Sequence, residues 1–362
     1  MGLLAQDGFD ILLPSLGTPE RNKTMTTGKA LDGKPYAGNP YVRFDEWEVV
    51  STATPSHGSL HCINSIQRRE FIRGACVAGV SLFAMRSEML FGEERLDESC
   101  VRAGLVADIH YSDMPDNDNR YYVESEAKLK ESVSVMNKVG PDFMVELGDL
   151  KDISKNKAAT VKCLDRIESV FAGFRGDRFH VPGNHDFDCF SPKEFFGHIH
   201  NSGQDVAQGY YSFVRGGITF IVLDGNYTKD FVHYAGDVPW DWTDSNIPPD
   251  ELKWLESELV KAKVAVVFCH QRLDNKAREY HEVKNAADVR NMLERSGKVK
   301  SVITGHDHIG GLCTINGITY YTLRAMIEGS GEKQNSYAVA SFYSDGTMSV
   351  KGWRLAMSLP RV

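Results

Sequence analysis

The chain has 362 residues, of which 42% are hydrophobic and 25% charged, a composition typical of a soluble globular protein. Its formal net charge of −8 argues against nucleic acids and anionic membrane surfaces as partners, since both attract proteins with a basic face. Its seven cysteines include no C-x-x-C spacing and therefore predict neither a disulfide scaffold nor a cysteine zinc site.

Residues 1–64 have a composition that does not favour a folded core. They include the stretch GKALDGKPYAGNP, which is rich in glycine and proline and has neither helical nor strand periodicity. Such a stretch buries too little apolar surface to fold. We therefore expect this segment to be disordered, or to lie upstream of a true translation start near residue 63.

Residues 65–90 contain the pattern of an export signal, QRREFIRGACVAGVSLFAM. The pair Arg68 and Arg69 precedes an apolar run from Ala75 to Met85, which is too short to span a bilayer but suits the core of a signal peptide. The segment resembles a twin-arginine signal, which implies the twin-arginine export machinery as a partner, a periplasmic location and no membrane contact in the mature form. The alternative is a short buried helix in a cytoplasmic protein.

Residues 101–357 alternate between two kinds of pattern and predict a single domain. Short apolar runs that break into polar loops predict five strands, in VRAGLVADIH, PDFMVELGDL, DRFHVPGNHD, VAVVFCHQR and VKSVITGHDH. Apolar residues at helical spacing predict four helices, at 124–140, 158–174, 248–262 and 286–297. Alternating strands and helices indicate an α/β core. Three further strands are expected in GITYYTL, SYAVASFY and TMSVKGWRL, the last two joined by a hairpin at Asp345-Gly346.

Each of the first five predicted strands ends in side chains that can bind a metal ion. Ligands of open α/β folds bind beyond the carboxyl ends of the strands, so we expect these side chains to meet in one pocket. In an extended segment residues i and i+2 point the same way, so Asp108 should face an ion together with His110. By the same rule His306 and His308 should converge while Asp307 faces away.

Seven side chains make up the expected ligand set: Asp108, His110, Asp149, Asn184, His270, His306 and His308. A mixture of carboxylate, imidazole and amide ligands suits manganese, iron, zinc or cobalt. Seven ligands exceed the needs of one tetrahedral ion and fit two ions about 3.5–4 Å apart that share a carboxylate. A lone aspartate or histidine at a strand end is more often a turn former or a hydrogen-bonded residue. We assign that role to His180, His198, His200, His233 and His281.

These motifs resemble those of the calcineurin-like metallophosphoesterases. The family pattern is D-x-H, G-D, G-N-H-D/E, a lone H and G-H-x-H. It stands here as Asp108-Ile109-His110, Gly148-Asp149, Gly183-Asn184-His185-Asp186, His270 and Gly305-His306-Asp307-His308. The resemblance implies a four-layer αββα sandwich of two mixed sheets flanked by helices.

The resemblance also implies how the ligands are shared between two divalent metal ions. One ion would be held by Asp108, His110, Asp149 and His308, and the other by Asp149, Asn184, His270 and His306. Manganese is the expected metal, with iron or zinc as alternatives. Purple acid phosphatases carry an iron-binding tyrosine where Asp152 stands here, so a tyrosinate centre is not expected.

Within the family, two segments look like those of the manganese-dependent ADP-ribose/CDP-alcohol diphosphatases. The matching positions are Tyr111, Asp113, Arg120, Tyr121, Tyr122, Gly310 and Gly311. This likeness implies a small phosphorylated substrate, and Arg120 and Tyr121 are the expected contacts. Tyr121 or Tyr122 would stack on a base or sugar, and core packing is the alternative for at least one of the two. Arg272 departs from the family, which commonly has a proline there, and its guanidinium is expected to grip a phosphate of the substrate. The alternative for Arg272 is a surface ion pair.

The expected reaction is hydrolysis of a phosphoester or phosphoanhydride by a hydroxide that bridges the two ions. His185 is expected to be the general acid, with Asp186 orienting its ring, and a turn-stabilising role is the alternative for Asp186. Competing functions are a phosphomonoesterase or cyclic-nucleotide phosphodiesterase on the same centre, and a catalytically silent binding module. A 5′-nucleotidase is less favoured, because no separate C-terminal substrate domain is present.

Overall fold

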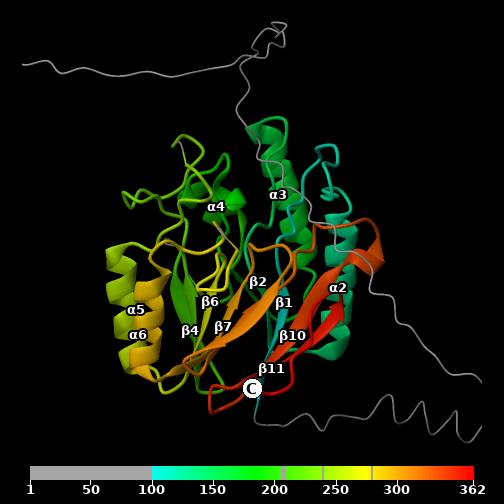
Figure 1. The fold of residues 1–362 in the computed structure, drawn as a ribbon. Coiled ribbons are helices and arrows are strands. Elements are labelled where there is room, and N and C mark those ends of the chain that lie inside the picture. The colour runs from blue at the N-terminus through cyan, green and yellow to red at the C-terminus, as the bar shows by residue number, and fades with distance from the viewer. Residues whose placement is uncertain (1–99, 205–208, 239, 279) are drawn as a thin grey trace, which may run out of the picture. The chain divides into compact units, whose positions relative to one another are not determined.

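The computed structural model describes residues 100–362 apart from 205–208, 239 and 279 (Figure 1). The predictions made for residues 1–64 and 65–90 lie outside the described residues. Within the described part, no helix is both long enough and apolar enough to cross a membrane. The five cysteines of this part, Cys100, Cys163, Cys189, Cys269 and Cys313, are all free thiols.

The first of two sheets contains five strands: β1 (Val101–Val106), β2 (Phe143–Glu146), β3 (Asp177–His180), β10 (Ser336–Phe342) and β11 (Met348–Arg354). Their order across the sheet is β11-β10-β1-β2-β3. Strands β1, β2 and β3 run parallel, whereas β10 is antiparallel to both β1 and β11. The sheet is therefore mixed, and the carboxyl ends of its three parallel strands meet at one edge.

The second sheet contains six strands: β4 (Tyr211–Arg215), β5 (Ile218–Leu223), β6 (Ala265–Cys269), β7 (Val299–Thr304), β8 (Gly311–Ile315) and β9 (Ile318–Thr322). Their order is β4-β5-β6-β7-β9-β8. The four central strands are parallel, and the edge strands β4 and β8 are antiparallel to their neighbours. This sheet is also mixed.

Helices cover the outer face of each sheet, as Figure 1 shows for α5 and α6 on one side and α2 and α3 on the other. The helices are α2 (Ser125–Val139), α3 (Lys157–Phe171), α4 (Pro192–His198), α5 (Pro249–Lys261) and α6 (Ala286–Ser296). One apolar cluster joins the two sheets, a second joins the first sheet to α2, α3 and α4, and a third joins the second sheet to α5 and α6. This arrangement confirms the predicted four-layer αββα sandwich.

Most predicted elements are confirmed, and their ends follow the expected chemistry. Helix α2 ends at Gly140, whose φ of 66° is the left-handed conformation that glycine adopts readily. Helix α5 begins at Pro249, with two acidic residues in its first turn. Strands β10 and β11 form the predicted hairpin, with Gly346 at φ 85° in its turn. The sequence interpretation missed α4, β4, β5 and β8.

Candidate metal centre

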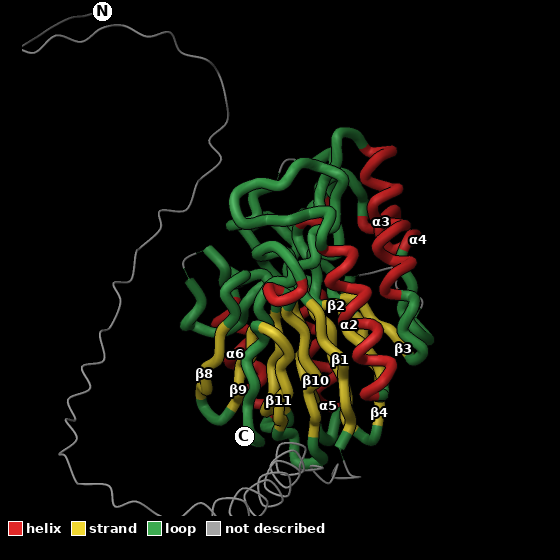
Figure 2. The backbone as a smooth tube through the Cα atoms, turned by 90° about the vertical axis from the view of Figure 1, so that its right-hand side faces the viewer, coloured by secondary structure: helices red, strands yellow, loops and turns green. Residues whose placement is uncertain are grey.

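The expected metal ligands all follow the carboxyl ends of strands, where the loops gather in Figure 2. Two come after β1, one after β2, one after β3, one after β6 and two after β7; in chain order they are Asp108, His110, Asp149, Asn184, His270, His306 and His308. The first four come from one sheet and the last three from the other. The centre therefore lies where the ends of the two sheets meet.

The first ligand group consists of Asp108, His110 and His308, whose ligand atoms all lie within 4.8 Å of one another. Nε2 of His110 lies 3.2 Å from Nε2 of His308. The latter nitrogen lies 3.7 Å from Oδ1 of Asp108. The three atoms therefore converge on one point from two different sheets.

The second ligand group consists of Asp149, His270 and His306, with the same mutual spacing of their ligand atoms. Nε2 of His270 lies 3.2 Å from Oδ2 of Asp149 and 3.2 Å from Nδ1 of His306. Asn184 is buried as well, and its Oδ1 has no hydrogen-bond partner among the described residues. An unpartnered buried amide oxygen is costly, and a metal ion beside it would remove that cost.

Asp149 links the two groups through a single atom. Its Oδ2 lies 3.4 Å from Nε2 of His110 in the first group and 3.2 Å from Nε2 of His270 in the second. One carboxylate oxygen thus faces one ligand of each set. This is the position that a bridging carboxylate needs.

The protonation of four of these groups, three histidines and Asp149, fits metal binding. Burial lowers the pKa of His110 to about 3, and it also lowers the pKa of His306 and His308 below the ordinary value. Neutral imidazoles are the form that ligates a metal. Burial raises the pKa of the Asp149 carboxyl, but the facing histidines, His270 foremost, hold it well below its usual range. Burial opposes protonation of His270, but the facing Asp149 carboxylate raises its pKa to about 9, so this imidazole must release a proton when it ligates a cation. Ionised Asp149 and the three neutral imidazoles are donors that suit divalent cations.

The backbone at the centre explains why the ligands converge, and it differs from our expectation. Asp108, His110, Asp149 and His306 have φ values of 52°, 47°, 59° and 65°. These residues are in the left-handed region and are not extended, so the reasoning from i and i+2 spacing was wrong although the side chains do meet. Left-handed conformations of non-glycine residues cluster at functional sites, where surrounding contacts hold them.

Asp186 supplies some of those holding contacts. Its Oδ2 accepts hydrogen bonds from the backbone amides of Asp149 at 3.1 Å and Gly183 at 2.8 Å. Its Oδ1 accepts another from the amide of Leu150 at 3.0 Å. Because the carboxylate is fully buried against these amides, the structure places it on the loop backbone and does not bring it to the ring of His185. This favours the turn-stabilising alternative over the orienting role.

His185 lies beside the first ligand group, and two other carboxylates orient it. Its ring centroid is 4.8 Å from that of His110, and its side chain is 27% exposed, so it can meet a substrate. Its Nδ1 lies 3.1 Å from Oδ2 of Asp188 and 3.5 Å from Oδ1 of Asp152. Burial opposes protonation, but Asp188 and Asp152 raise the pKa of His185 well above the ordinary histidine value. A protonated imidazole at this place can act as a general acid.

Arg272 is not available to a substrate, contrary to our expectation. Its Nε and Nη2 each donate to Asp274 at 2.9 Å, and its Nη1 donates to Oδ2 of Asp307 at 2.9 Å. The side chain is only 6% exposed. Arg272 therefore belongs to a buried ion-pair network in which Asp274 and Asp307 engage three of its five N–H donors. Its contact also shows that Asp307 faces away from its two histidine neighbours, as predicted.

Arg120 and Tyr121 lie near the centre with different contacts. Nη1 of Arg120 lies 3.8 Å from Oδ2 of Asp152, the carboxylate that also contacts His185, and the side chain is 32% exposed. The Tyr121 amide donates to the backbone oxygen of Ile327 at 3.3 Å, and its side chain is half-buried. Arg120 is thus placed beside the general-acid candidate, whereas the described contact of Tyr121 anchors its loop.

Sequence reasoning missed several residues that shape the site. Asp188 and Asp152 orient His185, and Glu328 contacts His308. Two aromatic rings lie against His306, and we call the residues that carry them the rim of the centre. Those rings belong to Trp242 and His281, with centroids 5.6 Å and 5.3 Å from that of His306. The motif IEGS contains Glu328 and was the one available signal. The two rim residues, Trp242 and His281, lie in loops outside the ligand motifs, so no sequence motif indicated that they would reach the centre.

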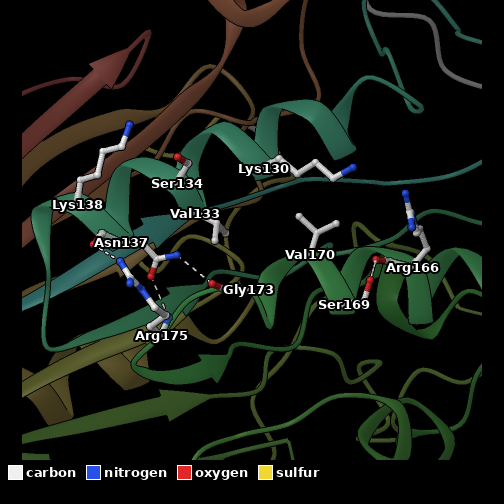
Figure 3. A pocket seen from close by; sticks show the side chains of 10 residues that line it. All are labelled: Lys130, Val133, Ser134, Asn137, Lys138, Arg166, Ser169, Val170, Gly173 and Arg175. Carbon is white, nitrogen blue, oxygen red and sulfur yellow. Dashed lines mark hydrogen bonds between the residues drawn. The ribbon is translucent and has the colours of Figure 1, made fainter.

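A separate groove of about 550 Å³ lies between α2 and α3 (Figure 3). Four basic residues line it together with small and apolar side chains: Lys130, Lys138, Arg166 and Arg175. It contains none of the metal-centre residues. The groove is therefore distinct from the reaction site.

Comparison with known proteins agrees with the geometry. The model of the calcineurin-like phosphoesterase family matches residues 101–310. A Danio rerio protein named manganese-dependent ADP-ribose/CDP-alcohol diphosphatase is 26% identical over 315 residues, covering 71% of this chain and 96% of that protein. An Arabidopsis thaliana protein of the same name is 25% identical over 268 residues, covering 62% of this chain and 86% of that protein.

Solved structures show the same fold. A dimetal phosphatase from Danio rerio has a TM-score of 0.61 and 22% identity, covering 72% of this chain and 99% of that one. A purple acid phosphatase from yellow lupin seeds has a TM-score of 0.51 and 11% identity, covering 71% of this chain and 52% of that one. At these identities the likeness concerns the fold alone.

Proposed function

The chain belongs to the calcineurin-like phosphoesterase family, and from that premise we propose that it hydrolyses the diphosphate bond of a nucleotide-linked substrate of the ADP-ribose or CDP-alcohol type. The broader activity, metal-dependent hydrolysis of a phosphoester or phosphoanhydride, follows from the family and the paired ligand groups. The observation that carries the chemistry is the single oxygen of Asp149 that faces His110 and His270.

The side chains divide the work of the reaction. Two divalent cations, when bound, supply Lewis-acid activation of water and of the phosphoryl group. His185 stands beside the first ligand group and would donate its proton to the departing oxygen. Asp188 and Asp152 contact Nδ1 of this imidazole, which fixes its ring, and both raise its pKa. No serine or cysteine nucleophile is required, so no phosphorylated enzyme should accumulate.

The substrate class is supported by resemblance and by charge. The two relatives described above are named as diphosphatases of ADP-ribose and CDP-alcohols. Arg120 lies beside Asp152 and is partly exposed, so it can meet an anionic substrate near His185. A phosphomonoesterase and a cyclic-nucleotide phosphodiesterase would use the same centre, and they are the alternative outcomes of the test.

A substrate panel tests the proposal. The protein would be assayed with manganese on ADP-ribose, CDP-choline, cyclic AMP, sugar phosphates, p-nitrophenyl phosphate and bis-p-nitrophenyl phosphate, with EDTA and His185→Ala as controls. We expect the highest kcat/KM on ADP-ribose or CDP-choline. A clear preference for a monoester or for cyclic AMP would assign one of the alternatives. No turnover of any substrate by protein with bound metal would indicate a binding module.

We also propose that the protein is exported through the twin-arginine pathway. The support is the pair Arg68 and Arg69 before the apolar run that ends at Met85. Replacing both arginines by lysine should retain the protein in the cytoplasm. Unchanged periplasmic recovery of the double variant in cell fractionation would overturn the proposal.

A further inference from the structure

A second arginine in the loop after β6 is tied to the metal-binding loop. Nε and Nη2 of Arg278 donate to Oδ1 of Asp307 at 2.9 Å and 2.5 Å. Asp307 stands between the ligands His306 and His308, and its other oxygen accepts from Arg272. The position of the Arg278 guanidinium is therefore fixed relative to the ligands themselves.

Arg278 differs from Arg272 in its exposure and in its remaining donors. Its side chain is 38% exposed, against 6% for Arg272. Asp307 engages its Nε and one N–H of Nη2, and Nη2 also lies 3.3 Å from Nε2 of His281. Nη1 has no hydrogen-bond partner among the described residues, so two N–H donors remain for a ligand.

The surroundings of Arg278 place it at the rim beside the second ligand group. The ring of His281 lies 5.3 Å from the ring of the ligand His306. The ring centroid of Trp242 lies 5.4 Å from that of His281 and 5.6 Å from that of His306, and Trp242 is 38% exposed. Arg278 thus contacts Asp307 and His281, which both adjoin the ligand His306, and its side chain is partly exposed.

We propose that Arg278 binds the phosphoryl group of the substrate that is not attacked. This inference rests on the proposed function and names the contact by which the protein would distinguish a diphosphate substrate from a phosphate monoester. A guanidinium presents paired donors that match phosphate oxygens, and Asp307 pre-orients this one. The proposal places the attacked phosphorus at the ligand groups, the departing oxygen within reach of His185, and the neighbouring phosphoryl group, which carries that oxygen, within reach of Nη1 of Arg278. A monoester has no group there.

Kinetics of Arg278→Ala and Arg278→Lys test the assignment against the matched surface control Arg295→Ala on α6. With Arg278→Ala, KM for ADP-ribose should rise about tenfold more than KM for p-nitrophenyl phosphate, as expected for the loss of a charge-assisted hydrogen bond. Arg278→Lys should show a smaller gap, because lysine keeps the charge and loses the paired donors. Equal losses on both substrates would overturn the inference.

A competition experiment separates this inference from the proposed substrate. ADP and AMP would be compared as inhibitors of p-nitrophenyl phosphate hydrolysis at saturating manganese, with metal content measured for each variant. Arg278→Ala should weaken inhibition by ADP about tenfold more than inhibition by AMP, with unchanged metal content. If that gap appears while ADP-ribose is not hydrolysed, the substrate proposal fails and the Arg278 contact stands. If ADP and AMP are weakened equally, the Arg278 contact is refuted.

Discussion

Oε1 of Glu328 lies 2.7 Å from Nδ1 of His308, on the side of the imidazole opposite to its metal-facing Nε2. Lys128 of α2 anchors the loop that carries Glu328 through hydrogen bonds to its backbone. The buried ammonium donates to the backbone oxygens of Met326, Glu328 and Gly329 at 2.9, 3.1 and 2.6 Å. The carboxylate thus fixes the tautomer and the rotation of a metal ligand from a well-anchored loop.

Replacing Glu328 should therefore weaken metal binding. We expect Glu328→Gln to lower manganese affinity about 10- to 100-fold, because the ligand ring loses its carboxylate partner. Isothermal titration of manganese into metal-free protein measures this directly. Glu332→Gln, at an exposed carboxylate four residues along the chain, is the control and should leave the affinity unchanged. Identical affinities for Glu328→Gln and the unmodified protein would exclude the positioning role.

The role of His185 predicts a dependence on the leaving group. His185→Ala should lower kcat about 10²- to 10⁴-fold on a poor leaving group such as an alkyl phosphate, since proton donation to that oxygen is lost. The loss should be much smaller on p-nitrophenyl phosphate, whose leaving group needs no proton. Metal content should not change. A uniform loss on both kinds of substrate would instead indicate a role in positioning.

A buried ion-pair cluster that contains no metal ligand predicts how stability depends on pH. Nδ1 and Nε2 of His180 lie 3.3 Å from Glu146 and 3.2 Å from Glu168. Burial would lower the pKa of His180, but Glu168 and Glu146 raise it to about 9 from the ordinary 6.5. Because the folded-state pKa is the higher one, the stabilisation is complete below about pH 6.5 and is lost as the pH rises through about 9.

Urea unfolding at several pH values checks this prediction. The unmodified protein should exceed His180→Gln in unfolding free energy by a margin that shrinks by roughly 3 kcal/mol between pH 6.5 and pH 9.5. Measuring both proteins in EDTA removes any contribution from bound metal. His198→Gln, at a partly exposed histidine paired with Asp165, is the matched control and should show no comparable trend. A margin that stays constant or grows with pH would contradict the assignment.

The metal ligands could be predicted from the sequence because each is coded locally. Every one follows a short apolar run within a few residues, and the strand order brings those ends together. The four-layer arrangement followed from resemblance, since the sequence pattern alone indicated only an α/β core. The strands β4 and β5 were missed although their sequence YSFVRGGITFIVL alternates and turns at a glycine pair.

The partners of the ligands could not be predicted, because they depend on contacts between loops. Nothing in CHQR shows that Asp274 and Asp307 will enclose Arg272, and nothing nearby in the sequence pairs Glu328 with His308. The left-handed backbone of Asp108 and His306 was equally hidden, since aspartate and histidine adopt it more often than most residues but the sequence does not show at which positions. His281 was predicted only to be a hydrogen-bonded residue that is not a ligand, and nothing near it in the sequence shows that its ring lies against His306.

The central claim is that the seven ligands form one cage around two cations. Its most direct test is a crystal structure of the manganese-loaded protein, with anomalous scattering recorded at the manganese edge. We expect two peaks, one among Asp108, His110 and His308 and the other among Asn184, His270 and His306, with Asp149 touching both. A single peak, or no peak at these residues in protein that turns over substrate, would contradict it.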